Sequence, residues 1–316
     1  MSDLYDVIII GAGPAGLSAG IYSGRSLLKT LIIERSKDGG QAATTNEIDN
    51  YPGAVEDETG PALIKKMVNQ AERFGVERVK ADVTAVEFEG DVKAVKCGDA
   101  VYKSKAVIIA SGAFPLRMGC KGEAELTGKG VSYCATCDAA LFEGLEVYVG
   151  GGGDSAIQEA LFISRFARKV TIIQNLPELT AAKSIQKKAF DNPKFDFVYD
   201  SVVQEVRGDT GILDTIVVKN GVTGELTEFN ADPDDETFGL FVFIGLVPQT
   251  DIFRGKIDMD GGYIPTDENM RTNVPGVYAV GDCRVKPLRQ VVTAAADGAI
   301  AAVHAEKYIE HMAGGD

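Results

Sequence analysis

Cys134 and Cys137, separated by two residues, are the pair in this sequence best suited to covalent chemistry, and an acid, Asp138, directly follows the second. A Cys-x-x-Cys pair is typical of a dithiol that closes a redox-active disulfide. Disulfide exchange needs an acid to protonate a leaving thiolate, and both histidines lie in the last thirteen residues. Asp138 is therefore the candidate acid. The alternative is that it caps a helix over residues 139–142.

A structural zinc site is the other use of such a pair. Zinc in such sites takes four protein ligands, and the remaining cysteines, Cys97, Cys120 and Cys283, form no second pair. Zinc would need ligands from elsewhere in the chain or from a second subunit. The redox interpretation is favoured, no metal is expected, and no role is assigned to the other three thiols. An odd number of cysteines does not suit a secreted disulfide scaffold.

The elements that would position this chemistry begin at the N-terminus. Residues 5–10 form an apolar, β-branched run, and a Gly-x-Gly-x-x-Gly turn at Gly11, Gly13 and Gly16 leads into a helical pattern. Strand, glycine turn and helix in this order bind a dinucleotide pyrophosphate at the helix N-terminus. Glu34 ends the next apolar run, where an acid accepts hydrogen bonds from a ribose. We expect a dinucleotide site here.

A second copy of this pattern starts at residue 145. Another apolar run leads into a turn that contains Gly151, Gly153, Asp154 and Ser155, and a helical pattern follows. The turn predicts a second Rossmann-type unit. Its function is left open between nucleotide binding and a turn that only shapes the fold.

Strand patterns continue after this second unit. The runs at 195–199, 213–218 and 226–229 predict hairpin strands around Asn220-Gly221. Buried strands ending in glycine then return at 241–245 and 277–281. The predicted fold class is α/β, with two Rossmann-like dinucleotide-binding domains, the second inserted into the first, and small antiparallel β elements.

Composition excludes several classes of function. The chain has 316 residues and a formal net charge of −14, which opposes binding to nucleic acid or to an anionic membrane. No run approaches the roughly 18 apolar residues of a membrane span, and the start has acids where a signal peptide has basic residues. We expect a cytoplasmic protein with neither nucleic acid nor membrane as a partner.

Between residue 5 and about residue 308 the sequence resembles the low-molecular-weight thioredoxin reductases. The resemblance is carried by a set of short motifs: GAGPAG at 11–16, GGQ at 39–41, IDNYPG at 48–53, ASGAFP at 110–115, SYCATCD at 132–138, GGGDSA at 151–156, GLVPQT at 245–250, VYAVGD at 277–282 and RQVVTAAADG at 289–298. The family fold implies an FAD-binding domain at 1–115 and 246–316. It also implies an inserted domain at 116–245 that carries the dithiol and binds nucleotide, and a homodimer.

The resemblance also assigns residues. In this family the C-terminal cysteine of the pair, here Cys137, faces the flavin, and Cys134 attacks the disulfide of thioredoxin or a thioredoxin-like protein. The residues implied for FAD binding are Gly11, Gly13, Pro14, Ala15, Gly16, Glu34, Arg35, Gly40, Gln41, Asn50, Val83, Ala110, Gly112, Gly281, Asp282, Arg289, Gln290 and Val291.

The sequence departs from the family where NADPH-dependent members carry His-Arg-Arg and a further Arg to hold the 2′-phosphate. Gln174, Asn175, Leu176 and Thr180 stand at these positions. Gln174 does not supply the carboxylate that would hold an NADH ribose. The favoured hypothesis is a thioredoxin reductase with FAD and a donor other than NADPH. Some relatives without these arginines take electrons from reduced ferredoxin or a deazaflavin, and reduced ferredoxin is the preferred donor here.

A basic segment gives the ferredoxin hypothesis a physical argument. Six cations and Glu178 lie between residues 164 and 188, and an acidic ferredoxin could dock there. Solvated helix faces are the alternative. Three other functions stay open: an NADPH-dependent thioredoxin reductase, a ferredoxin–NADP oxidoreductase, which the dithiol argues against, and a non-enzymatic flavin redox sensor.

Overall fold

The computed structural model describes residues 4–44, 48, 50–56 and 58–314. Asp49, in the 48–53 motif, lies outside the described residues. The chain divides into two compact units, Met1–Phe114 with Val247–Asp316 (unit 1) and Pro115–Leu246 (unit 2). The two connecting segments, β7 (Ala113–Pro115) and β16 (Leu246–Pro248), pair with each other.

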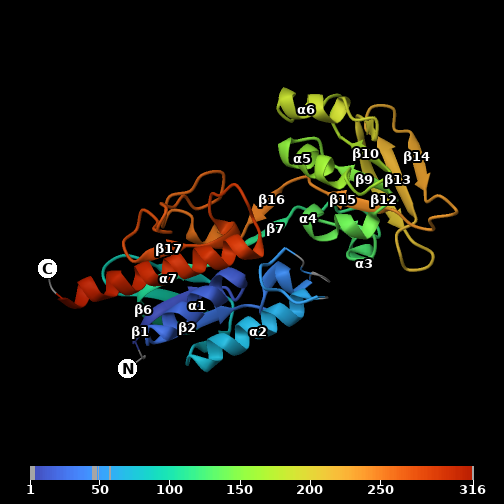
Figure 1. Ribbon diagram of the computed structural model, residues 1–316. Helices are drawn as coiled ribbons and strands as arrows, with labels where there is room; N and C mark the ends of the chain where they lie inside the picture. Colours follow the sequence, from blue (N-terminus) through green and yellow to red (C-terminus); the bar gives the residue numbers. More distant parts are fainter. Residues whose placement is uncertain (1–3, 45–47, 49, 57, 315–316) are drawn as a thin grey trace. The chain divides into compact units, whose positions relative to one another are not determined.

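Unit 1 is built on a sheet in the order β3-β2-β1-β6-β5-β4, with β17 paired to β6 (Figure 1). Its strands are β1 (Leu4–Ile10), β2 (Thr30–Glu34), β3 (Glu77–Lys80), β4 (Ala85–Glu87), β5 (Lys93–Cys97), β6 (Ala100–Ile109) and β17 (Val277–Ala279). Its helical segments are α1 (Pro14–Arg25), η1 (Gly40–Thr44), α2 (Gly60–Arg73), η3 (Asp251–Phe253), η4 (Gly281–Cys283) and α7 (Val291–Gly314). β1, β2, β3, β6 and β17 pair in parallel, as a Rossmann-like sheet requires.

The core of unit 1 follows from the alternation of side chains along β1. Val7 and Ile9 are fully buried in a cluster with residues of α1, α2 and α7, whereas Ile8 and Ile10 belong to a second cluster with residues of β4, β5 and β17. The alanine-rich α7 lies along α1 (Figure 1). A Cβ on Gly298 would lie 2.1 Å from the Ala15 carbonyl oxygen, so small residues permit this close approach.

Unit 2 contains a parallel sheet in the order β11-β10-β9-β15-β8 and an antiparallel sheet in the order β12-β13-β14. The parallel strands are β8 (Val131–Ser132), β9 (Glu146–Gly150), β10 (Lys169–Ile173), β11 (Phe195–Val198) and β15 (Gly239–Val242). The antiparallel strands are β12 (Ser201–Arg207), β13 (Thr215–Asn220) and β14 (Leu226–Asn230). The helical segments are α3 (Glu123–Leu126), α4 (Ala135–Asp138), η2 (Ala139–Phe142), α5 (Asp154–Ile163) and α6 (Lys183–Phe190).

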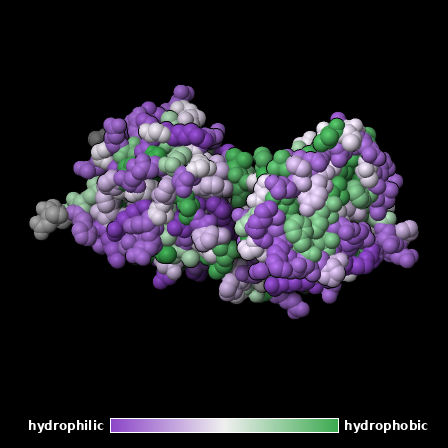
Figure 2. All heavy atoms as spheres, turned by 90° about the horizontal axis from the view of Figure 1, so that it is seen from above, coloured by the Kyte–Doolittle hydropathy of each residue, from purple (hydrophilic) through white to green (hydrophobic). Residues whose placement is uncertain are grey.

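The expected class of two Rossmann-like units, the second inserted into the first, is confirmed. One detail is wrong: residues 195–199 do not form a hairpin strand, because β11 pairs in parallel with β10 at the sheet edge. β13 and β14 form the hairpin, and β12 pairs antiparallel with β13 as the third strand of that sheet. No helix among the described residues is long and apolar enough to cross a membrane. Hydrophilic residues predominate over the face seen in Figure 2.

Candidate functional site

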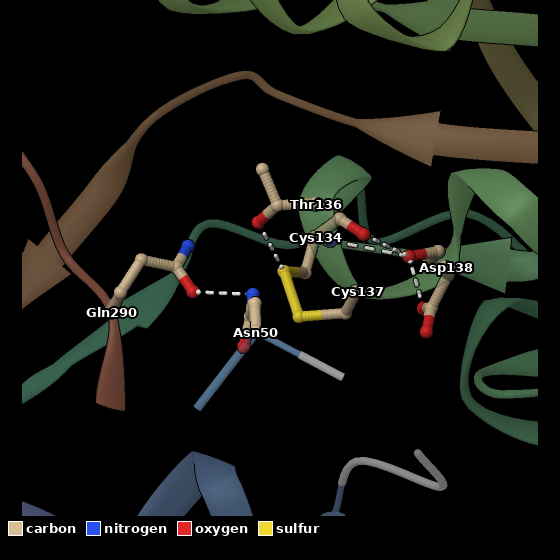
Figure 3. Close-up of a disulfide and its surroundings, with 7 residues drawn as sticks. Asn50, Cys134, Thr136, Cys137, Asp138 and Gln290 are labelled. Atoms are coloured by element: carbon tan, nitrogen blue, oxygen red, sulfur yellow. Dashed lines mark hydrogen bonds between the residues drawn. A yellow bond between two sulfur atoms is a disulfide. The ribbon is translucent and has the colours of Figure 1, made fainter. Parts of the chain in front are cut away.

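Cys134 and Cys137 form a disulfide with Cα atoms 5.3 Å apart, at the start of the short helix α4 (Figure 3). Cys134 takes the N-cap position, and its Sγ lies 3.5 Å from the Thr136 hydroxyl. Both cysteines are partly exposed. A disulfide between the two sulfurs favours redox chemistry, because a zinc site would need both as free thiolates.

Asp138 does not cap the helical turn that follows it, since no side-chain cap hydrogen bond forms at η2. Its Oδ2 instead accepts a hydrogen bond from the Ser132 hydroxyl at 2.6 Å (Figure 3). Burial raises the pKa of Asp138, and the bond from Ser132 opposes that rise. The capping alternative is therefore wrong. A carboxyl group with a raised pKa next to the dithiol is suited to proton transfer.

The first glycine turn has the backbone geometry of a pyrophosphate site. Gly11 has φ +109°, and a Cβ there would lie 2.3 Å from the Ala110 carbonyl oxygen. On Gly16 a Cβ would lie 1.9 Å from the Gly11 carbonyl oxygen, whereas a Cβ on Gly13 would meet no atom within 4 Å. Gly13 is the N-cap of α1, so the backbone at the helix N-terminus is open to a phosphate group. Glu34 ends β2 and accepts from the Ala12 N–H at 2.8 Å, which places its carboxylate at the turn.

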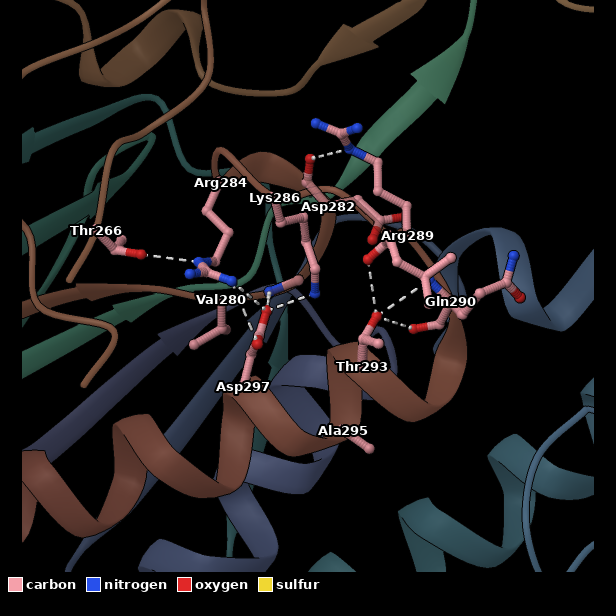
Figure 4. Close-up of polar contacts among 12 residues, drawn as sticks. Thr266, Val280, Asp282, Arg284, Lys286, Arg289, Gln290, Thr293, Ala295 and Asp297 are labelled. Atoms are coloured by element: carbon pink, nitrogen blue, oxygen red, sulfur yellow. Dashed lines mark hydrogen bonds and ion pairs between the residues drawn. The ribbon is translucent and has the colours of Figure 1, made fainter. Parts of the chain in front are cut away.

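A network of charged side chains supports the turn at Gly281 and Asp282 (Figure 4). Asp297 of α7 accepts from the Gly281 N–H at 3.0 Å and from the Lys286 Nζ at 2.7 Å, and Arg284 lies 3.4 Å away. The side chains of Lys286 and Asp297 are 4% and 9% exposed. The network fixes the turn at Gly281, and with it the position of Asp282.

One carboxylate oxygen of Asp282 is buried without a hydrogen-bond partner among the described residues. This oxygen is Oδ1, and burial raises the pKa of Asp282. A buried carboxylate oxygen without a donor fits a ligand that supplies a hydroxyl group. FAD has such hydroxyls, and the glycine turn fits its pyrophosphate, so the residues present fit this cofactor.

The other expected FAD residues are distributed around these two features. The structure places Pro14, Ala15 and Gly16 in the first turn of α1, Gly40 and Gln41 in η1, Ala110 and Gly112 just after β6, Arg289 and Gln290 just before α7, and Val291 as the first residue of α7. Asn50 donates to the Gln290 amide oxygen at 3.2 Å. Arg35 donates to Gln249 at 3.3 Å and Arg289 stacks on Tyr263. Val83 is buried in the hydrophobic cluster that contains Ile33.

The second glycine turn opens on a pocket of about 600 Å³ that lies wholly within unit 2. Its lining is formed by residues 150–156, 173–176, 180, 201–203 and 243–245, with Leu116 and Met118. Asp154, in the first turn of α5, is the one charged residue among them. Gly151 has φ +123°, and the turn with Gly153 and Ser155 keeps the geometry of a nucleotide turn.

The positions that hold a 2′-phosphate in relatives make other contacts here. Gln174 is 4% exposed and donates to the Glu178 carbonyl at 3.2 Å. A Cβ on Gly152 would lie 2.6 Å from the Gln174 side chain, which shows how closely this amide packs on the turn. Thr180 donates through its hydroxyl and its backbone N–H to the Gly152 carbonyl. Neutral groups therefore occupy the place of the guanidinium groups.

The basic segment between residues 164 and 188 carries less unpaired positive charge than its residue types alone suggest. Ion pairs join Arg168 to Asp235 at 2.7 Å and Lys169 to Asp196 at 2.7 Å, and Lys187 pairs with Asp191. Lys183 lies 3.9 Å from Glu178. The local charge is mostly compensated by acids outside the segment, so the expected docking surface for an acidic ferredoxin is not supported.

Two features of the site were missed by sequence reasoning. Ser132 is the first residue of the SYCATCD motif, but no role was assigned to it, because a serine two residues before a cysteine can have many roles. The contacts of Asp297 with Lys286 and Arg284 join a helix to a loop, and their spacing follows no short motif.

The family model of the pyridine nucleotide-disulphide oxidoreductases matches residues 5–298. A thioredoxin reductase from Peptoclostridium acidaminophilum is 57% identical over 98% of this chain and 98% of its own. A thioredoxin reductase structure from Streptococcus pyogenes covers 98% of this chain and 99% of its own at 42% identity, with a TM-score of 0.91. A ferredoxin-flavin thioredoxin reductase structure from Clostridium acetobutylicum covers 98% and 99% at 29% identity, with a TM-score of 0.53. The chain therefore belongs to the pyridine nucleotide-disulphide oxidoreductase family, and within it to the FAD-dependent thioredoxin reductases.

Proposed function

We propose that this enzyme reduces the disulfide of thioredoxin, or of a thioredoxin-like protein, with electrons from reduced ferredoxin rather than from NADPH. The observation that carries the choice of donor is the charge of the pocket at the second glycine turn. Its lining contains one charged residue, the acid Asp154. A 2′-phosphate placed there would lose its hydration and gain no cation in return.

The dithiol passes the electrons to the substrate. FAD, when bound and reduced, would supply two electrons and one proton to the Cys134–Cys137 disulfide, which would leave Cys134 as a thiol and Cys137, the proposed flavin-side sulfur, as a thiolate. Asp138 takes the proton of the Cys134 thiol, and the Cys134 thiolate attacks one sulfur of the substrate disulfide. The substrate S–S bond breaks, and its leaving thiolate takes the proton from Asp138. Cys137 then attacks the Cys134 sulfur, which closes the disulfide again and releases the second substrate thiolate.

Unit 1 is the proposed FAD-binding domain. The turn from Gly11 to Gly16 would hold the pyrophosphate, Glu34 the adenosine ribose, and Asp282 a hydroxyl of the cofactor through its free Oδ1. Unit 2 is the proposed inserted domain with the dithiol. We also propose a homodimer, on the family resemblance, which sedimentation of the purified protein tests.

Ferredoxin is favoured as the donor by the chemistry of the pocket together with one structural likeness. The Clostridium acetobutylicum protein is named as a ferredoxin-flavin thioredoxin reductase, and nearly all of its chain aligns with this one. The docking surface is not assigned, because the basic segment around α6 is largely paired.

An NADPH-dependent thioredoxin reductase is the second candidate, and one observation favours it. The pocket of about 600 Å³ is retained, with its glycine turn at the N-terminus of α5, and such a site accepts a pyrophosphate without cations. On this alternative, NADPH would bind through its pyrophosphate and nicotinamide, with little contribution from the 2′-phosphate.

Anaerobic reduction of the FAD-loaded enzyme distinguishes the two candidates. NADPH, NADH and reduced ferredoxin are offered in turn, and loss of flavin absorbance is followed before thioredoxin is added. We expect ferredoxin to reduce the flavin within the turnover time and both nicotinamides to fail at micromolar concentration. Rapid reduction by micromolar NADPH would establish the second candidate instead.

A further inference from the structure

The Ser132 hydroxyl lies within hydrogen-bond distance of both the Asp138 carboxyl group and the backbone of Cys134. It donates to Asp138 Oδ2 at 2.6 Å and accepts from the Cys134 N–H at 3.1 Å. A second acceptor, the Cys134 carbonyl, lies 3.4 Å from the same hydroxyl. Ser132 ends β8 and is 5% exposed, so water does not compete freely for these bonds.

We propose that Ser132 is a positioning residue that keeps Asp138 hydrogen-bonded in both of its protonation states during disulfide exchange. The inference rests on the proposed role of Asp138 as the acid. It assigns to this serine a role in the reaction beyond holding the loop.

The geometry permits both states because a hydroxyl has one donor and two acceptor sites. When Asp138 is ionised, the Ser132 hydrogen points to Oδ2. When Asp138 is protonated, the carboxyl group donates to Ser132 Oγ, and the hydroxyl hydrogen turns to the Cys134 carbonyl. The Cys134 N–H keeps its acceptor throughout. The proton can then move between Asp138 and a sulfur without leaving a buried group unpaired, which would be costly.

The groups around Asp138 make the hydrogen bond from Ser132 the main influence that opposes the burial-raised pKa of Asp138. Helix α5, which packs on α4, carries Asp154 and Glu159, and neither contributes to the shift. Segment η2 has no titratable side chain, and Tyr133, next to Ser132, donates its hydroxyl to Glu123.

The test measures the pH dependence of disulfide reduction in the full-length protein. Dithiothreitol reduces Cys134–Cys137, and the thiols formed are trapped by alkylation at timed intervals. The ratio of each variant's rate to the parent's rate cancels the titration of the reagent. Thioredoxin turnover by the FAD-loaded enzyme is measured over the same pH range.

The rate of disulfide reduction should fall at high pH as Asp138 loses its proton, and this fall is the alkaline limb of the pH profile. Ser132→Ala should move the limb upward by about one pH unit, because the ionised carboxyl group loses a charge-assisted hydrogen bond and the pKa of Asp138 rises. Ser132→Thr keeps the hydroxyl and should restore the limb, whereas Ser132→Val, of the same shape, should not. This matched pair decides the question if the alanine variant does not fold. Ser164→Ala, at the end of α5, is the control and should match the parent.

An unchanged limb in Ser132→Ala, or equal limbs in the threonine and valine variants, would overturn the role of Ser132. Asp138→Asn tests the proposed function separately, since it should abolish the limb and lower turnover by about 10²-fold. A limb that persists in Asp138→Asn would remove the acid itself, and the two failures are thus distinguishable.

Discussion

Restoring guanidinium groups to the second nucleotide site should create NADPH binding. The triple variant Asn175→Arg, Leu176→Arg and Thr180→Arg places three cations at positions that line the pocket. All three side chains are exposed, Leu176 by 42%, so the change buries no charge and should leave the fold intact. Gln174 is kept at first, because its buried amide packs on Gly152.

The magnitude follows from the number of new contacts. A charge-assisted hydrogen bond to phosphate contributes about 1.5 to 3 kcal/mol, and exposure favours the lower end. Three such bonds should therefore strengthen NADPH binding by about 4 to 5 kcal/mol, or roughly 10³-fold. NADH lacks the 2′-phosphate, so its affinity should change little. Adding Gln174→His tests whether the fourth position of the family pattern contributes further.

Calorimetric titration with NADPH and NADH measures the effect directly, and anaerobic flavin reduction shows whether the bound NADPH is productive. The control carries the same added charge on the β13–β14 hairpin, as Val222→Arg, Thr223→Arg and Thr227→Arg, at exposed positions outside the pocket. An equal gain for NADH, or an equal gain in the control, would show that general electrostatic attraction and not 2′-phosphate recognition is responsible. Micromolar NADPH affinity in the parent protein would refute the reasoning at its start.

Three further predictions concern the dithiol and unit 1. Cys134→Ser should leave the Cys137 thiolate facing the oxidised flavin and produce a long-wavelength charge-transfer band, whereas Cys137→Ser should not; the same spectrum from both would reverse or remove the assignment. Asp282→Asn should weaken FAD binding about 10-fold or more. Burial raises the pKa of Asp282, so its ionised form destabilises the folded protein as pH rises through that pKa. Without FAD, Asp282→Asn should therefore have a higher free energy of unfolding than the parent at pH 8. Near pH 3 the two free energies, measured by denaturant unfolding, should be nearly equal. Asp297→Ala leaves Lys286 buried without its carboxylate and should cost about 3 to 5 kcal/mol of unfolding free energy, whereas removal of the exposed Arg254–Asp251 pair should cost less than about 1 kcal/mol.

Features with local physical causes could be predicted from the sequence. The glycine turns at Gly11 and Gly151 both have positive φ, which glycine adopts without strain, and each lies between a strand and a helix. Cys134 and Cys137 are close enough in sequence for one helical turn to bring their sulfurs together. The loss of the cations at 174–180 is likewise a matter of residue type.

Features that depend on partners distant in the chain could not be predicted from the sequence. The alternation of residues 195–199 indicates a strand but does not specify its neighbour, and β11 pairs in parallel with β10 because both belong to the same Rossmann-like sheet. The sequence of the basic segment likewise does not reveal that Arg168 pairs with Asp235, because the two residues are 67 positions apart in the chain.

The polar contacts at the site were also decided by the tertiary structure. Asp138 could have been a helix cap or an acid on sequence alone, and its burial beside Ser132 removed the first alternative. The free oxygen of Asp282 and the support of its turn by Asp297 exist only after α7 packs against the sheet. Burial makes the pairing of a polar group energetically important, and the burial of each side chain is set by the whole fold.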